Sequence, residues 1–239
     1  MKQLLLDFLK RQGIHVARNS LPKGSDLISD LKRYGLDQCF DTLIDVGANV
    51  GNFSALFMES FPHLKNIVAI EPESKNLEKL NNRFHGKNVQ CLGKAISDKE
   101  GVAWLNVCEN AVAHSLIDQN WSTTAVEVNV MTLSQVIGGL PEDAKIFLKT
   151  DTEGNDVNVL KGGSDLLTSG RCPLVLCEVG FSDPPVQTQF QEVHSELTAY
   201  GFDLWGFYNQ SIYGRYMGLN YCDALYLHRQ CAEHLLSRR

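Results

Sequence analysis

The segment DVGANVG, at positions 45–51, lies between a short apolar run and a stretch with helical spacing. The run at 42–46 (TLIDV) predicts a strand, and residues 52–61 predict the helix that follows it. Glycines at 47 and 51 permit a sharp turn and let the backbone approach a ligand without an intervening Cβ. A strand that enters a helix through such a turn is the first unit of an α/β fold, so the segment favours that fold class.

The remainder of the chain continues the alternation of strands and helices. Strands are predicted at 66–70, 89–92, 102–107, 125–130, 145–149 and 173–178, and helices at 74–84, 133–137, 156–168 and 187–200. We expect 102–107 and 125–130 at the margin of the sheet. The tail predicts two paired strands, 202–208 and 224–228, one of them antiparallel to the rest. The pattern therefore predicts a Rossmann-like, mostly parallel sheet with a C-terminal antiparallel strand and helices on both faces.

The N-terminal 40 residues predict two helices, at 1–12 and 24–39, with Ser25 and Asp26 as caps of the second. We expect residues 1–40 to be a helical extension that acts as a lid or a dimer contact, and residues 41–239 to form the main domain. The first helix is too short and too charged to span a bilayer. These features predict a cytoplasmic protein without membrane insertion.

Composition excludes several classes of function. The net charge of −6 and the pI of about 5.6 argue against a nucleic-acid partner, which would favour a basic surface. The seven cysteines form no CxxC pair, and the seven histidines form no HxxH or HExxH pair. Neither a disulfide framework nor a zinc or histidine-based metal site is therefore predicted.

The first turn and the acidic residue after the second strand together suggest a nucleoside cofactor. The helix that starts near Asn52 offers free N–H groups to a carboxylate, and Asp45 can take an ammonium group. Glu71 can accept both ribose hydroxyls, and the end of the third strand can flank an adenine ring. A carboxylate, an ammonium group, two ribose hydroxyls and an adenine ring are the groups that S-adenosylmethionine (SAM) carries. The predicted cofactor-binding residues are Asp45, Gly47, Ala48, Asn49, Gly51, Asn52, Glu71, Pro72, Ala95, Ile96, Ser97 and Asp151.

Two alternatives remain open for this motif. A nicotinamide cofactor favours GxGxxG, whereas the chain has GxNxG at 47–51. A glycine-rich turn between a strand and a helix can also be a tight turn without a ligand.

Four further segments resemble a known family. IDVGANVGNFS (44–54), IEPES (70–74), AISDKEG (95–101) and LKTDTEGNDVNVLKGG (148–163) are similar to the FkbM family of methyltransferases. The segments VEVNVMTLSQVI (126–137) and DALYLHR (223–229) extend the resemblance over most of the chain. The resemblance implies a class I methyltransferase fold with a seven-stranded sheet, SAM as donor with S-adenosylhomocysteine as product, and methylation of a hydroxyl on a natural product or a sugar.

The candidate catalytic residues follow two predicted strands. Asp151 and Glu153 come after 145–149, and Glu178 ends the next strand, so all three should meet at the carboxyl edge of the sheet. Converging carboxylates can raise a pKa to make a base, or can hold Mg²⁺, which we do not favour. Glu153 can instead cap a helix, Glu178 can be structural, and His114 is a loop base or a surface residue.

The predicted activity is O-methylation of a hydroxylated small molecule. An N-methyltransferase acting on a small molecule or a peptide, and a non-catalytic SAM-fold module, remain the alternatives. An alcohol needs a base to lose its proton, whereas a free nitrogen lone pair does not. Replacement of the candidate bases therefore separates the first two.

Overall fold

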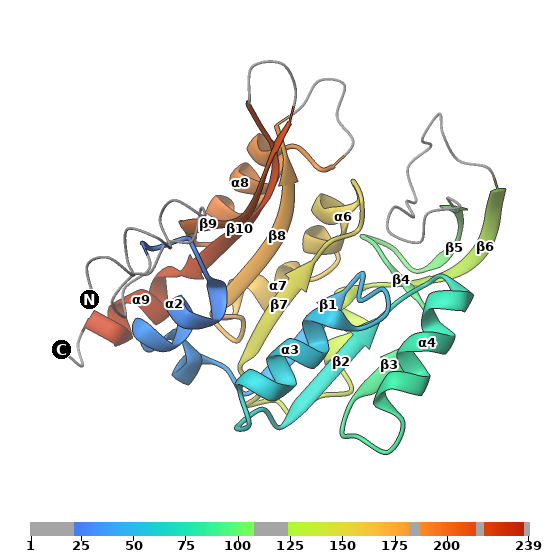
Figure 1. Cartoon of the computed structure of the whole chain (residues 1–239), viewed down its shortest axis with the longest axis horizontal. Helices are drawn as coiled ribbons and strands as arrows, with labels where there is room; N and C mark the ends of the chain where they lie inside the picture. Colours follow the sequence, from blue (N-terminus) through green and yellow to red (C-terminus); the bar gives the residue numbers. More distant parts are fainter. Residues whose placement is uncertain (1–21, 108–123, 182–186, 214–217, 237–239) are drawn as a thin grey trace, which may run out of the picture.

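The computed structural model describes residues 22–107, 124–181, 187–213 and 218–236 (Figure 1). Its main sheet has seven strands in the order β3-β2-β1-β7-β8-β10-β9, and all except β10 run in one direction. The strands are β1 (Thr42–Val46), β2 (Asn66–Ile70), β3 (Gln90–Leu92), β7 (Ile146–Thr150), β8 (Leu174–Gly180), β9 (Phe202–Tyr213) and β10 (Gly218–His228). This confirms the predicted mostly parallel sheet with a C-terminal antiparallel strand.

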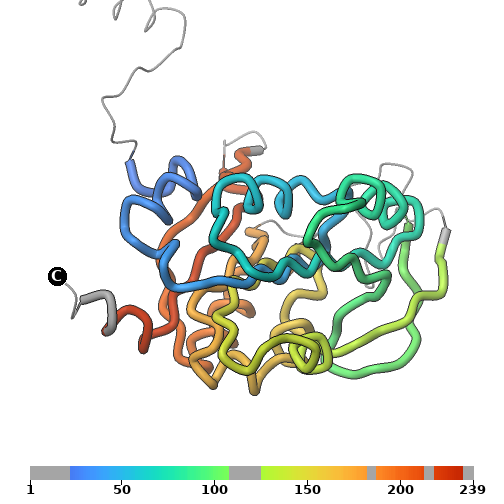
Figure 2. The backbone as a smooth tube through the Cα atoms, turned by 90° about the horizontal axis from the view of Figure 1, so that it is seen from below, coloured from blue at the N-terminus to red at the C-terminus, as the bar shows by residue number. Residues whose placement is uncertain are grey.

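Helices cover both faces of the sheet, as Figure 2 shows from a perpendicular direction. One face carries α2 (Leu27–Arg33), α3 (Asn52–Ser60) and α4 (Ser74–Phe84), and the other carries α5 (Leu133–Ile137), α6 (Asp156–Lys161), α7 (Ser164–Thr168) and α8 (Phe190–Ala199). A last helix, α9 (Arg229–Leu236), follows β10. Apolar strand residues alternate between the two faces and fill both cores, so the sheet is buried on each side.

A second sheet corrects the predicted place of two strands. β5 (Gly101–Val107) and β6 (Thr124–Met131) do not extend the main sheet; they pair with β4 (Ala95–Ile96) in the order β4-β6-β5. Figure 1 shows this small sheet at the end of the molecule opposite to β9. Its inner face has an apolar core of its own, which allows it to pack without joining the main sheet.

Glycines interrupt two helices that the sequence predicts to be continuous. The stretch 24–39 divides into α2 and the 3₁₀ helix η1 (Leu36–Cys39), because Gly35 between them has φ 73°. The stretch 156–168 divides into α6 and α7 at Gly162 and Gly163. Of the two predicted caps, Asp26 is confirmed and Ser25 is not: the Asp26 side chain accepts a hydrogen bond from the Ser29 N–H at 2.7 Å.

The first described residues pack against the C-terminal strands. The Tyr208 hydroxyl of β9 donates to the buried Asp30 carboxylate of α2 at 3.0 Å. The helix predicted at 1–12 lies outside the described residues. Within the described ranges, no helix combines the length and the apolar character that crossing a membrane requires.

Candidate functional site

A cavity that is partly open to solvent lies at the carboxyl ends of β1, β2 and β7. The strand order reverses here, because β1 pairs with β2 on one side and with β7 on the other. In open α/β sheets such a switch point is where ligands bind. The described lining residues are Val46, Gly47, Asn49, Ile70, Glu71, Pro72, Asn76, Lys94, Ala95, Ile96, Leu105, Asp151, Thr152, Glu153 and Asn155.

The turn after β1 has the predicted backbone, and both of its glycines lie close to other parts of the chain. Gly47 and Gly51 have φ values of 76° and 79°, which a residue with a Cβ rarely adopts. A Cβ on Gly47 would lie 1.9 Å from the Asp151 carbonyl oxygen, and one on Gly51 would lie 2.5 Å from the Phe84 ring. Neighbouring atoms of the protein therefore exclude a side chain at both positions, and Gly47 also lines the cavity.

Glu71 lies at the end of β2 with its carboxylate at the cavity wall. Its two oxygen atoms accept hydrogen bonds from the N–H groups of Asn49 and Glu73, both at 2.9 Å. Burial raises the pKa of Glu71 to about 7, although these two N–H groups oppose the shift. Each carboxylate oxygen has a further lone pair for a ligand hydroxyl.

The small sheet supplies the apolar side of the cavity. Ala95 and Ile96 of β4, both predicted as cofactor-binding residues, are buried there. Leu105 of β5 also lines the cavity, but the sequence analysis missed it because the strand 102–107 was placed at the margin of the sheet. Asn155 donates its side-chain N–H to the Ile96 carbonyl at 2.9 Å. This bond connects the loop after β7 to the small sheet.

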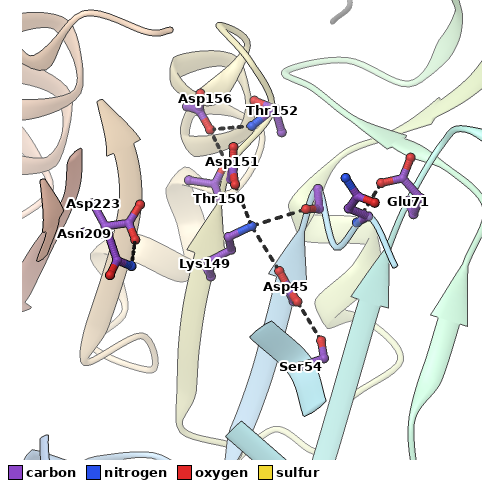
Figure 3. Close-up of polar contacts among 12 residues, drawn as sticks. Asp45, Ser54, Glu71, Lys149, Thr150, Asp151, Thr152, Asp156, Asn209 and Asp223 are labelled. Atoms are coloured by element: carbon purple, nitrogen blue, oxygen red, sulfur yellow. Dashed lines mark hydrogen bonds and ion pairs between the residues drawn. The ribbon is translucent and has the colours of Figure 1, made fainter. Parts of the chain in front are cut away.

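Asp45 does not occupy its predicted place. Its side chain is fully buried and does not line the described cavity wall. One oxygen accepts from the Ser54 hydroxyl at 2.6 Å, and the other faces the Lys149 ammonium at 3.4 Å (Figure 3). A lysine of the chain therefore takes the position that we assigned to the ammonium group of a ligand.

Lys149 is a functional candidate that the sequence did not single out. Its ammonium reaches Asp151 at 3.1 Å, the Gly47 carbonyl at 3.2 Å, and Asp45 (Figure 3). Burial would lower the pKa of Lys149, but the Asp151 and Asp45 carboxylates outweigh burial and raise it. The parallel register places Lys149 beside Asp45, a pairing that no local pattern indicates.

Asp151, Glu153 and Glu178 meet at the sheet edge, as predicted. One oxygen atom from each carboxylate lies within 4.8 Å of the others, a spacing that also suits a hard cation. Asp151 and Glu153 line the cavity, whereas Glu178, near the end of β8, is not among the described lining residues. Burial, followed by the charges of Asp151 and Glu153, raises the pKa of Glu178 to about 10.

Glu153 has a backbone conformation that is uncommon for a side-chain-bearing residue, with φ 52°. Burial and the nearby Asp151 and Asp156 carboxylates raise its pKa to about 8. Asn155, not Glu153, occupies the N-cap position of α6, so the capping alternative is wrong. A carboxyl group with a pKa near 8 can accept a proton at physiological pH.

The loop that carries these carboxylates is held by Asp156, which is 1% exposed. Its carboxylate accepts from the Thr150 hydroxyl at 2.6 Å and from the Thr152 N–H at 3.2 Å (Figure 3). It also accepts from the Thr188 hydroxyl at 2.8 Å. Three donors on one buried carboxylate fix the loop between β7 and α6.

Asp223 of β10 adds a fourth carboxyl group to Asp151, Glu153 and Glu178, and the sequence analysis did not identify it. It pairs directly with Glu178 in the β8–β10 register, and it accepts from the Asn209 amide at 2.6 Å. Burial raises its pKa to about 6. Its position depends on a register between distant strands, which a single sequence does not specify.

The other predicted residues have varied positions. Pro72 and Asn49 line the cavity, whereas Ala48, Gly51, Asn52 and Ser97 are not among its described lining residues. Asn52 is exposed and accepts from Arg83 at 2.6 Å, and Ala48 packs in the core beneath α4. His114 lies outside the described residues.

Comparisons with known proteins agree with this geometry. The model of the methyltransferase FkbM domain matches residues 45–204. Methyltransferase FkbM from Methylobacillus flagellatus KT is similar in structure, with a TM-score of 0.54 and 15% identity over 79% of this chain and 44% of that one. The present chain therefore spans less than half the length of that protein.

Two further solved structures are similar at lower scores. A TehB-like SAM-dependent methyltransferase from Corynebacterium glutamicum has a TM-score of 0.43 and 10% identity, over 95% of this chain and 96% of that one. The 1,6-didemethyltoxoflavin-N1-methyltransferase of Burkholderia thailandensis has a TM-score of 0.43 and 14% identity, over 82% and 74%. No curated protein sequence matches the chain. Because the family model covers more than half of the sequence, the chain belongs to the FkbM methyltransferase family.

Proposed function

We propose that the protein transfers a methyl group from SAM to a hydroxyl oxygen of a small molecule, a sugar or another natural product. The observation that carries this proposal is the group of Asp151, Glu153 and Glu178, whose oxygen atoms lie within 4.8 Å of one another beside the cavity. A hydroxyl is a poor nucleophile until a base takes its proton, so an oxygen acceptor needs such a group.

The cavity wall fits the parts of the cofactor. Glu71 offers carboxylate oxygen atoms to the two ribose hydroxyls, and Ala95, Ile96 and Leu105 offer an apolar surface to the adenine ring. Bound SAM would supply a methyl group activated by the positive charge on its sulfur. In our assignment, the described chain contributes the ribose contact through Glu71 and the acceptor side through Asp151 and Glu153.

Glu153 is the base that we favour. It lines the cavity, and its pKa of about 8 is close to physiological pH. A general base is most effective when its pKa lies near the pH at which the enzyme works. Glu153 would take the hydroxyl proton while the new carbon–oxygen bond forms and the sulfur–methyl bond breaks. Holding the acceptor in line with the methyl group would provide most of the remaining acceleration.

The charge of the site supports a small acceptor over a nucleic acid. Asp151, Glu153, Glu178 and Asp223 form an acidic row at the sheet edge, and the net charge of the chain is −6. The net negative charge of the chain would repel the phosphodiester backbone of a nucleic acid. Carboxylates beside a cavity instead suit hydroxyl groups, which donate hydrogen bonds to them.

The test is release of S-adenosylhomocysteine in the presence of two panels of acceptors, hydroxylated sugars and polyketides in one and amines in the other. We expect turnover in the hydroxyl panel, a loss of at least tenfold in kcat for Glu153→Gln, and no change for Glu127→Gln, an exposed residue of β6. Turnover with amines that survives Glu153→Gln would favour nitrogen instead. A parallel assay with EDTA measures any dependence on Mg²⁺.

A further inference from the structure

Lys149 connects two walls of the cavity from beneath. Its side chain is 10% exposed, and its ammonium contacts the Gly47 carbonyl at 3.2 Å and the Asp151 carboxylate at 3.1 Å. Gly47 belongs to the turn after β1, and Asp151 belongs to the loop after β7; both line the cavity. A single buried cation therefore joins the predicted cofactor turn to the acceptor side.

The position of Lys149 is itself fixed from behind. Asp45 faces the ammonium at 3.4 Å, and the Ser54 hydroxyl of α3 holds the other oxygen of Asp45 at 2.6 Å. Asp45 and Lys149 are register partners on β1 and β7, so the sheet brings the two charges together (Figure 3). The result is a continuous row of contacts, from Ser54 through Asp45 and Lys149 to Asp151.

Lys149 itself is not among the described residues that line the cavity. It can therefore act on a ligand only through the groups that it holds. Its ammonium binds one oxygen of Asp151, Oδ2, and the Asp151 side chain is about one-third exposed at the cavity. Without the ammonium, the Asp151 carboxylate and the Gly47 carbonyl would lose the hydrogen-bond donor that they share.

We propose that Lys149 is a positioning residue for methyl transfer, which holds Asp151 and the Gly47 turn in the arrangement that the cofactor and the acceptor need. The proposal rests on the proposed function of this cavity as the SAM site. Lys149 makes no contact with the reacting atoms in this assignment, so its loss would weaken the site without removing a group that performs chemistry.

The opposite charges of Lys149 and Asp45 offer a way to distinguish a positioning role of Lys149 from a contribution to folding stability. Replacing Lys149 alone leaves Asp45 buried without its cation, which costs free energy of folding whatever the role of the lysine. Replacing Asp45 by Asn together with Lys149 by Met removes both charges at nearly constant volume. Such paired replacements are often neutral for stability.

The experiment measures S-adenosylhomocysteine affinity by calorimetry and the Tm of four proteins: wild type, Lys149→Met, Asp45→Asn with Lys149→Met, and Lys145→Met. Lys145 immediately precedes β7 and is exposed, so it controls for loss of a positive charge near the same strand. We expect Lys149→Met to weaken binding at least tenfold and Lys145→Met to change it less than twofold. In the double variant, we expect the Tm to recover while binding stays weak.

Recovery of both Tm and affinity in the double variant would overturn the proposal, because Lys149 would then only neutralise Asp45. Wild-type affinity in Lys149→Met would overturn it as well. If Lys149→Met does not fold, the double variant decides alone. Failure of the wild-type protein to bind S-adenosylhomocysteine is a different result, which refutes the proposed function of the cavity.

Discussion

Alanine at Gly47 should be far more costly than alanine at Gly35, although both glycines have nearly the same backbone conformation. Their φ values are 76° and 73°, so each substitution imposes the left-handed penalty of about 1–2 kcal/mol. A lower entropy of the unfolded chain offsets about 0.4–1 kcal/mol of that. At Gly35 no atom lies within 4 Å of the new Cβ, so the net cost there is about 1 kcal/mol.

At Gly47 the new Cβ would lie 1.9 Å from the Asp151 carbonyl oxygen, which is backbone and must move by more than 1 Å to reach ordinary contact. Overpacking of this kind adds about 1–3 kcal/mol, for a total of about 2–4 kcal/mol. For a chain of this size about 1 kcal/mol lowers Tm by 2–4 °C. We expect Gly35→Ala to lower Tm by about 3 °C and Gly47→Ala by about 6–12 °C.

Differential scanning calorimetry measures both changes, and a urea titration gives the free energies of unfolding. Gly47→Ala should also weaken S-adenosylhomocysteine binding, because the displaced carbonyl belongs to Asp151 at the cavity wall. Equal losses of Tm for the two variants would refute the close approach of the β1 turn to the β7 loop, on which the account of the site depends.

Two further predictions concern the acidic loop. Burial raises the pKa of Glu178 to about 10, so the folded protein binds more protons than the unfolded chain between about pH 4.5 and 10, and stability falls as pH rises through that window. Glu178→Gln should therefore raise Tm at pH 8 by about 2–4 °C and much less at pH 5, a contrast that calorimetry at the two pH values tests. Asp156→Ala removes the acceptor of three donors and should cost about 2–4 kcal/mol in a urea titration, against no measurable change for the exposed Asp143→Ala.

Much of the fold follows from local pattern. The strands at 42–46 and 66–70 and the helix at 74–84 have the predicted bounds, because each is a short run whose apolar period is unambiguous. The glycine pair at 162–163 is visible in the sequence, but the reason that only glycine fits at 162 is not: a Cβ there would lie 2.1 Å from the Ser97 carbonyl oxygen. That contact joins segments 65 positions apart, so no local pattern contains it.

The candidate site likewise contains some residues that the sequence predicts and others that it does not. Glu71, Asp151 and Glu153 were predicted because each follows an apolar run that ends at the same edge of the sheet. Lys149 and Asp223 were missed, since their roles arise from strand register: Asp45 with Lys149, and Glu178 with Asp223. Register pairs residues that are distant along the chain, and only the assembled sheet specifies which carboxylate a given lysine neutralises.

The central claim is that the cavity beside Glu71 is the SAM site, and calorimetry with S-adenosylhomocysteine tests it most directly. Two hydrogen bonds from ribose hydroxyls to the Glu71 carboxylate contribute about 3 kcal/mol or more, which corresponds to about 100-fold in affinity. We expect the wild type and the exposed variant Glu78→Ala on α4 to bind equally well, and Glu71→Ala to bind at least 100-fold more weakly. Equal affinity in Glu71→Ala, or binding of NADH in place of S-adenosylhomocysteine, would contradict the claim.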